Sequence, residues 1–250
     1  MKKFNYGHLL WFGTPPVTPE PKPYLLGWNP ALANFKPFGL PVKELASSSR
    51  ADVDFVASIQ AMIDAVPADI LSVVRKFGMA VLPVADLYDV ISWLPYLGPG
   101  GTWEKRTQWD TVSGVCLFDG HLSVVARNYR EERGYYKAEN RQGVFNHELG
   151  HGFDAAFEYI SQTREFLECV AADIEKLDRL NQRIYAYLLQ SMPTGPSEIF
   201  AECFAAILGM CAVPSWTKDM PVYFPESFGF VKRLVDDLSS ALPPKEPDQC

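Results

Sequence analysis

Two histidines four residues apart, with a glutamate directly after the first, constrain this chain more than any other feature. His147, Glu148 and His151 form the pattern H-E-x-x-H inside a segment, 144–160, that has helical periodicity. Residues four apart lie on one face of a helix, so both imidazoles can bind the same metal ion. The glutamate can accept a proton from a metal-activated water, which makes Glu148 a candidate general base. The apolar positions should face the core; they are Phe145, Leu149, Phe153, Ala156 and Ile160.

A catalytic zinc ion takes three protein ligands and leaves one position open, so the motif needs a third residue. Metzincin-type sites place a glycine three residues after the second histidine and a ligand six after it. Here those positions are Asp154 and Phe157, which excludes that arrangement. A thermolysin-type ligand would fall near Val170 and Ala171, neither of which can bind a metal through its side chain.

The best third ligand is in the segment S-E-I-F-A-E, residues 197–202. Glu198 and Glu202 lie one helical turn apart in otherwise apolar sequence. Two glutamates on such a helix repel each other and lose solvation unless a positive charge is near. We therefore expect Glu198 to bind the metal and Glu202 to hydrogen-bond the free nitrogen of a ligand histidine. The alternative is a half-exposed acidic helix face.

The remaining pattern predicts an α+β fold, mostly helical, with a small mixed sheet. Pro193, Gly195 and Pro196 should end the preceding segment and leave Ser197 as the N-cap of the glutamate helix. The sequence Asp119-Gly120 predicts a hairpin turn, and the charged segment 128–141 should be exposed. The expected helices are 52–65, 68–77, 86–97, 144–160, 164–177, 180–189, 198–211 and 227–238, and the expected strands are 79–84, 115–118 and 122–127.

Composition divides the chain into three segments and argues against some classes of partner. A Pro-rich arm (1–49) precedes the predicted domain (50–240), and a Pro-rich, charged tail (241–250) follows it. The net charge of −7, without a basic block, argues against nucleic acid as a partner. No stretch is long and apolar enough for a membrane span, and the N-terminal apolar run is too short for a signal peptide. We expect a cytoplasmic protein, or one exported by a route that needs no signal peptide.

The five cysteines indicate reduced thiols rather than a disulfide framework. They are odd in number, widely spaced and without a CxxC motif. Cys203 and Cys211 lie in apolar sequence, so we expect both in the core.

Several of these segments occur together, in the same order, in one known family. The W-D-x-V-x-G loop at 109–114, the strand at 122–127, H-E-L-G-H-G-F-D at 147–154 and E-I-F-A-E at 198–202 resemble the catalytic domain of anthrax lethal factor and the related bacterial Pro-Pro endopeptidases. The resemblance covers about residues 50–235. It implies a zincin-like metallopeptidase domain of the gluzincin type.

The resemblance also implies roles for individual residues. His147, His151 and Glu198 would bind Zn2+, Glu148 would be the general base, and Glu202 would support the site. Asp154 matches a further family position, with a structural or supporting role. The family has a tyrosine about two turns before the ligand glutamate that stabilises the oxyanion, but here that position falls near Ser191. Two nearby tyrosines are candidates for this role, Tyr187 first and Tyr185 second.

The expected function is a zinc-dependent endopeptidase, such as a toxin or effector, that hydrolyses a protein substrate. The substrate would lie in extended form along an edge strand, expected at 122–127. Trp103 and Trp109 are candidates for the cleft rim, with core packing as the alternative reading. The competing function is a catalytically silent zincin-fold module that binds or interacts without turnover, and the third reading is a coincidental motif in a structural protein.

Overall fold

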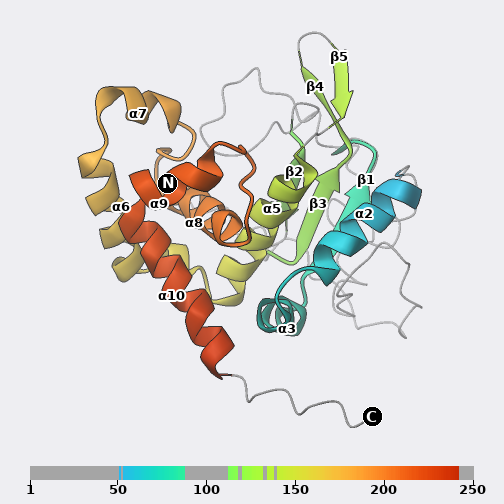
Figure 1. Ribbon diagram of the computed structural model, residues 1–250, viewed down its shortest axis with the longest axis horizontal. Helices are drawn as coiled ribbons and strands as arrows, with labels where there is room; N and C mark the ends of the chain where they lie inside the picture. Colours follow the sequence, from blue (N-terminus) through green and yellow to red (C-terminus); the bar gives the residue numbers. More distant parts are fainter. Residues whose placement is uncertain are drawn as a thin grey trace, which may run out of the picture.

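A computed structural model of the chain describes residues 51, 53–87, 112–117, 120–131, 134–137 and 140–241. Within these residues the fold is α+β and mostly helical, with a small mixed sheet, as the sequence predicts (Figure 1). Several predictions lie outside the described residues, namely the arm at 1–49, most of the helix at 86–97, Trp103, Trp109 and nearly all of the tail at 241–250.

The first two helices are confirmed. Helix α2 (Val53–Asp64) buries Phe55, Ile59 and Ile63, which recur at helical spacing on one face. Helix α3 (Ala68–Phe77) follows Pro67 and ends at Gly78. In the described part of the chain no single helix is long and apolar enough to cross a membrane; α2 and α3 pass that test only together, and they are bent by 110°.

Three short strands form the sheet in the order β1-β3-β2. Strand β1 (Ala80–Val84) pairs in parallel with β3 (Leu122–Ala126), and β2 (Gly114–Leu117) pairs with β3 in antiparallel fashion. The antiparallel pairing of β2 with β3 confirms the predicted hairpin. The prediction of an edge strand at 122–127 was wrong, because β3 is the central strand and all five of its residues are buried. Among the described strands of this sheet, β1 and β2 are the outer ones.

The charged segment before the motif contains a hairpin that the sequence analysis did not predict. Strand β4 (Asn128–Glu131) pairs with β5 (Gly134–Lys137), and in Figure 1 the pair projects from the top of the molecule. The charges of this segment obscured the strand-forming tyrosines between them.

Helices α5 (Arg141–Ala156) and α8 (Thr194–Ile207) form the centre of the molecule. Helix α5 lies between the sheet and α8 (Figure 1). The predicted single apolar stripe describes α5 incompletely, because nearly every residue from Gly143 to Ala155 is buried. The two helices cross closely at Gly150, where an added Cβ would lie 2.9 Å from the Cα of Ala201. A glycine is therefore needed at this crossing.

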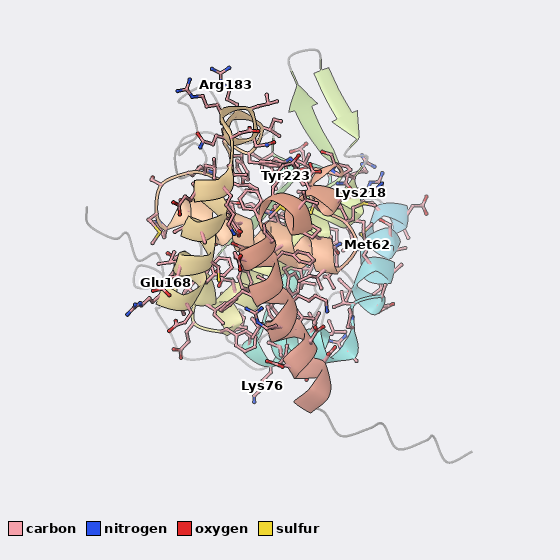
Figure 2. The ribbon with its side chains drawn as sticks, turned by 60° about the vertical axis from the view of Figure 1, so that its left-hand side comes forward. Met62, Lys76, Glu168, Arg183, Lys218 and Tyr223 are labelled. Carbon is pink, nitrogen blue, oxygen red and sulfur yellow. The ribbon has the colours of Figure 1, made fainter. Side chains whose placement is uncertain are left out.

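The outer elements differ from prediction mainly at their ends. Helix α6 (Arg164–Lys176) is confirmed, whereas α7 (Arg179–Ile184) is shorter than expected. Helix α10 (Pro225–Ala241) is joined to α6 by the buried Asp173, which accepts hydrogen bonds from the backbone N–H and the hydroxyl of Ser227. The 3-10 turn η6 (Ile160–Gln162) and helix α9 (Trp216–Tyr223) were not predicted. Charged side chains such as those of Lys76, Glu168 and Arg183 point away from this body (Figure 2).

Helix α8 begins earlier than the sequence suggested. It starts at Thr194, so Ser197 lies inside the helix and is not its N-cap. Proline is tolerated in the first helical turn because the N–H groups there have no partner within the helix. Pro196 therefore belongs to the helix that it was expected to precede. The predicted core positions of Cys203 and Cys211 are confirmed, since both are buried.

Candidate metal centre

Three side chains from α5 and α8 converge on one point. The Nε2 atoms of His147 and His151 are 3.1 Å apart. The Oε2 atom of Glu198 lies 3.2 Å from the Nε2 of His147 and 3.6 Å from that of His151. The four-residue spacing on α5 thus places both imidazoles on one helix face, and the first turns of α8 bring the carboxylate to them.

The spacing of these three atoms fits a zinc ion. Ligands about 2.0–2.1 Å from a tetrahedral zinc lie roughly 3.3–3.4 Å from one another. The three distances here, 3.1, 3.2 and 3.6 Å, surround that value. Among the described residues, these three are the group of histidine, cysteine and carboxylate side chains that could hold a metal ion. The donor set, two imidazoles and one carboxylate, suits zinc and leaves room for a fourth ligand.

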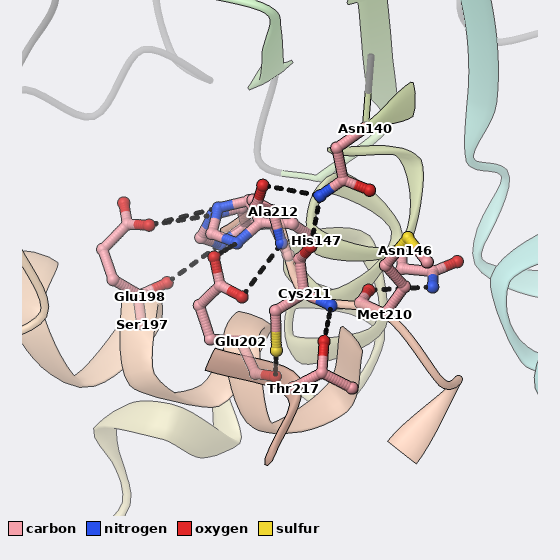
Figure 3. A network of polar contacts seen from close by, with 11 residues as sticks. Asn140, Asn146, His147, Ser197, Glu198, Glu202, Met210, Cys211, Ala212 and Thr217 are labelled. Carbon is pink, nitrogen blue, oxygen red and sulfur yellow. Dashed lines mark hydrogen bonds and ion pairs between the residues drawn. The ribbon is translucent and has the colours of Figure 1, made fainter. Parts of the chain in front are cut away.

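The other nitrogen of His147 faces Glu202, the residue that the sequence analysis expected to hydrogen-bond one of the two histidines. The Nδ1 atom is 3.1 Å from Oε1 of Glu202, a carboxylate whose side chain is only 1% exposed. The second oxygen of Glu202 accepts a hydrogen bond of 3.2 Å from the backbone N–H of Ala212 (Figure 3). Glu202 is therefore fixed from the side opposite to the imidazole.

The segment that follows α8 also holds the start of α5. The side-chain amide of Asn140 donates to the carbonyl oxygens of Cys211 and Ala212, each at 2.7 Å. Six residues further on, the amide of Asn146 donates to the carbonyl of Met210 at 3.0 Å (Figure 3). These asparagines were not predicted from the sequence, because their partners lie more than sixty residues away and no local pattern marks them.

The charged groups that meet at this point shift the pKa values of His147 and Glu198. Burial opposes protonation of His147, but Glu202 and Glu198 outweigh it and raise the pKa of the imidazole well above its ordinary value. Burial would also raise the pKa of Glu198, yet the two facing histidines hold the pKa of that carboxyl well below its usual range. The site is thus built to hold a positive charge, whether a proton or a metal ion.

Glu148 lies on the sheet side of the two histidines. It is only 6% exposed, and burial raises the pKa of its carboxyl above the ordinary glutamate value. Its Oε1 would lie 2.8 Å from a Cβ added at Gly114, on β2. Gly114 ends the W-D-x-V-x-G loop, and the sequence analysis gave it no role. The structure shows that the absence of a side chain there makes room for Glu148.

The two candidate tyrosines have different surroundings. Tyr187 hydrogen-bonds to Glu198, and burial of its hydroxyl beside that carboxylate raises its pKa. The whole residue is nevertheless 36% exposed. Tyr185 is 1% exposed, and its hydroxyl donates to Asp219 at 3.0 Å, away from the site. The connection between α7 and α8 therefore brings Tyr187 to the centre and leaves Tyr185 in the core.

Asp154, the remaining predicted residue, lies behind His151. It is buried, and its carboxylate accepts hydrogen bonds from the backbone N–H and the hydroxyl of Ser161, at 2.8 and 2.6 Å. The Nδ1 of His151 itself lies 3.3 Å from the hydroxyl of Ser197. The sequence analysis considered Ser197 only as a helix cap and missed this contact.

The outer edge of β2 passes beside Glu148. The N–H of Ala126 donates to the carbonyl of Ser113 at 2.9 Å, which fixes the alternation of the β2–β3 ladder. The backbone groups of Gly114 and Cys116 consequently point away from β3. No described strand pairs with this edge, so its N–H and C=O groups are oriented for an added chain.

Comparison of the chain with protein-family models gives no match, and comparison with curated proteins gives none either.

Proposed function

We propose that this protein is a zinc-dependent endopeptidase of the gluzincin type, with a zincin-like fold similar to the lethal-factor catalytic domain. The observation that carries the proposal is the convergence of His147 Nε2, His151 Nε2 and Glu198 Oε2 within 3.1–3.6 Å, with the buried Glu148 on the same helix. Three ligands and a nearby general base are the protein groups that a zinc peptidase uses to hydrolyse a peptide bond.

The chemistry divides between the metal and the side chains. When bound, zinc supplies a Lewis acid that polarises the scissile carbonyl and lowers the pKa of a coordinated water. Glu148 accepts the proton of the attacking water and then donates it to the leaving amine. Burial raises the pKa of Glu148, and a raised carboxyl pKa favours a group that must both accept and donate a proton.

Tyr187 is the residue that we assign to the developing oxyanion. Its hydroxyl already lies in the site against Glu198, and its high pKa keeps it protonated as a hydrogen-bond donor. The alternative function, a catalytically silent zincin-fold module, gained its support from the absence of a tyrosine near residue 191. The position of Tyr187 favours the enzyme instead.

The substrate would bind along β2 rather than along β3. An extended peptide can add to a free strand edge through backbone hydrogen bonds, and the outward groups of Gly114 and Cys116 offer such an edge beside Glu148. We therefore propose a protein or peptide substrate in extended form. Cleavage of a peptide library would identify its sequence, and action as an exported effector stays a prediction.

The proposal is tested by metal analysis together with cleavage of a diverse peptide library, with cut sites identified by mass spectrometry. The purified full chain should bind one equivalent of zinc and cut peptides. Glu148→Gln keeps the shape of the side chain, so it should keep the zinc and lose on the order of 10²–10⁴ in kcat/KM. Glu168→Gln, an exposed glutamate on α6, is the matched control and should cut normally.

Two results would contradict the enzyme. One is a wild-type protein that binds no zinc, and the other is a Glu148→Gln variant as active as the wild type. Stoichiometric zinc with no cleavage of any peptide would favour the silent binding module.

A further inference from the structure

The two ligand histidines are held from behind by different chemistry. Glu202 places a carboxylate 3.1 Å from the Nδ1 of His147. The Nδ1 of His151 faces an uncharged hydroxyl instead, that of Ser197 at 3.3 Å. A histidine ligand binds through one nitrogen only if the proton is on the other, so the partner of Nδ1 matters for both rings.

The hydroxyl of Ser197 also lies within reach of the buried carboxylate of Asp154. Burial raises the pKa of Asp154, and hydrogen bonds from Ser161 and Ser197 oppose that rise. One oxygen of Asp154 accepts from the N–H of Ser161 at 2.8 Å, and the other lies 2.6 Å from the Ser161 hydroxyl. Asp154 therefore acts as an acceptor.

The single proton of the serine hydroxyl decides the direction of the chain of hydrogen bonds. A hydroxyl has one proton to donate and two lone pairs. If that proton goes to the Asp154 carboxylate, Ser197 can only accept a hydrogen bond from the Nδ1–H of His151. The Nε2 of His151 is then unprotonated, and its lone pair points to His147 and Glu198.

We propose that Ser197 is a positioning residue that connects the Asp154 carboxylate to the Nδ1–H of His151 and so fixes the tautomer and orientation of this imidazole for metal binding. The inference rests on the proposed zinc site and deepens it. It also explains why a serine inside α8, next to the ligand Glu198, faces α5.

Asp154 has a second task, which makes Ser197 the better residue to test. The turn after α5 contains two consecutive non-glycine residues in the left-handed region, Glu158 at φ +57° and Tyr159 at φ +62°. Such backbone is strained and needs support from its surroundings. The hydrogen bonds between Asp154 and Ser161 supply that support directly after the strained pair. Substitution of Asp154 would disturb this turn as well as His151.

The test uses the full chain with Ser197→Ala, Ser197→Thr and Ser161→Ala. Zinc affinity is measured by competition with a chromophoric chelator, and the ligand geometry is followed by the visible absorption of the cobalt-substituted protein. Loss of a partner behind a metal ligand costs about 10- to 100-fold in metal affinity, which is the effect expected for Ser197→Ala. Ser197→Thr keeps the hydroxyl and should restore most of the affinity and the cobalt spectrum.

Ser161→Ala separates positioning from structure. It weakens the turn that Asp154 supports, so it should lower the melting temperature while changing zinc affinity far less than Ser197→Ala. The inference is overturned if Ser197→Ala binds zinc as tightly as the wild type, if Ser197→Thr is no better than Ser197→Ala, or if Ser161→Ala is equally weak. A wild-type protein without zinc would instead overturn the proposed function, and this inference with it.

Discussion

The two sides of the candidate centre are built in opposite ways. On the side that would hold the metal, called here the ligand side and formed by α5 and α8, the side chains of His147 and Glu202 are 7% and 1% exposed, and the free nitrogen of each histidine faces a partner. On the proposed substrate side, formed by β2 and the connection between α7 and α8, every residue of β2 is partly exposed and Tyr187 is 36% exposed. The first side is closed by buried contacts, whereas the second leaves the outer backbone edge of β2 partly exposed.

The contrast follows from how each side is anchored. The ligand side depends on two helices that cross at Gly150 and on the segment 210–212, which contacts both of them. The substrate side depends on a four-residue strand that, among the described strands, pairs only with β3. Substitutions on the ligand side should therefore change metal binding and activity together, whereas those on the substrate side should change activity alone.

The largest effect should come from removing a ligand. Glu198→Ala leaves two histidines, whereas a stable catalytic zinc site uses three protein ligands. The variant should fail to retain zinc after dialysis and should have no measurable peptidase activity. Metal content by mass spectrometry measures the first and the peptide assay the second. Retention of a full equivalent of zinc would show that Glu198 is not a ligand.

Tyr187→Phe should lower kcat through the substrate side and leave zinc binding on the ligand side unchanged. Loss of one donor to an oxyanion costs on the order of 10²–10³ in kcat. Zinc content should be unchanged, because Tyr187 contacts Glu198 through its hydroxyl and is not one of the three proposed ligands.

Tyr185→Phe is the matched control for Tyr187→Phe. It removes the hydrogen bond to Asp219 in the core, which should cost roughly 1 kcal/mol of stability and leave kcat unaffected. Thermal unfolding and steady-state kinetics of both variants test the pair. Equal losses of kcat in the two would refute the assignment of Tyr187 to the oxyanion.

Gly114→Ala, on β2, should lower activity by displacing Glu148, the proposed general base. The added Cβ would lie 2.8 Å from Oε1 of Glu148 and 2.6 Å from a methyl carbon of Val144, so Glu148 must move. A displacement of about 1 Å at a reacting group lowers the rate on the order of 10²-fold. The zinc content should stay at one equivalent. Gly229→Ala, on α10 and free of close contacts, is the control and should cut as well as the wild type.

Much of the ligand side could be predicted from the sequence, because helical spacing converts directly into geometry. Residues four apart on a helix share a face, so His147, His151, Glu198 and Glu202 were assigned before their distances were known. Glu202 can reach His147 once α5 and α8 lie side by side. The sequence already favoured that arrangement, because two glutamates in an apolar helix need a positive charge nearby.

The substrate side was predicted less well, because it depends on contacts between distant segments. Strand order placed β3 in the centre of the sheet, and nothing in the local pattern of either strand encodes that order. On the ligand side the exception is Ser197, which was misread because prolines were taken as the end of a segment rather than as the first turn of α8. Its contact with His151 joins residues 46 apart, which no short motif could indicate.

The smallest effect concerns the proton that the ligand side holds when no metal is bound. The pKa of His147 is well above its ordinary value, since Glu202 and Glu198 outweigh the effect of burial, so the metal-free imidazole should be protonated at neutral pH. In the metal-free protein this charge stabilises the fold below the unfolded-state pKa of about 6.5 and is lost as pH rises through the folded value.

Zinc must displace this proton to bind His147, so zinc affinity should increase with pH and level off above the raised pKa. Calorimetric titrations of zinc in buffers of different ionisation enthalpy measure the number of protons released. Glu202→Gln removes the strongest of the partners that raise the pKa of His147, so it should release fewer protons at neutral pH. The matched substitution Ser197→Ala, behind His151, should leave the proton count unchanged while weakening zinc binding. An equal decrease in both variants would mean that the two histidines share the proton, and the ligand side would then be less asymmetric than its contacts indicate.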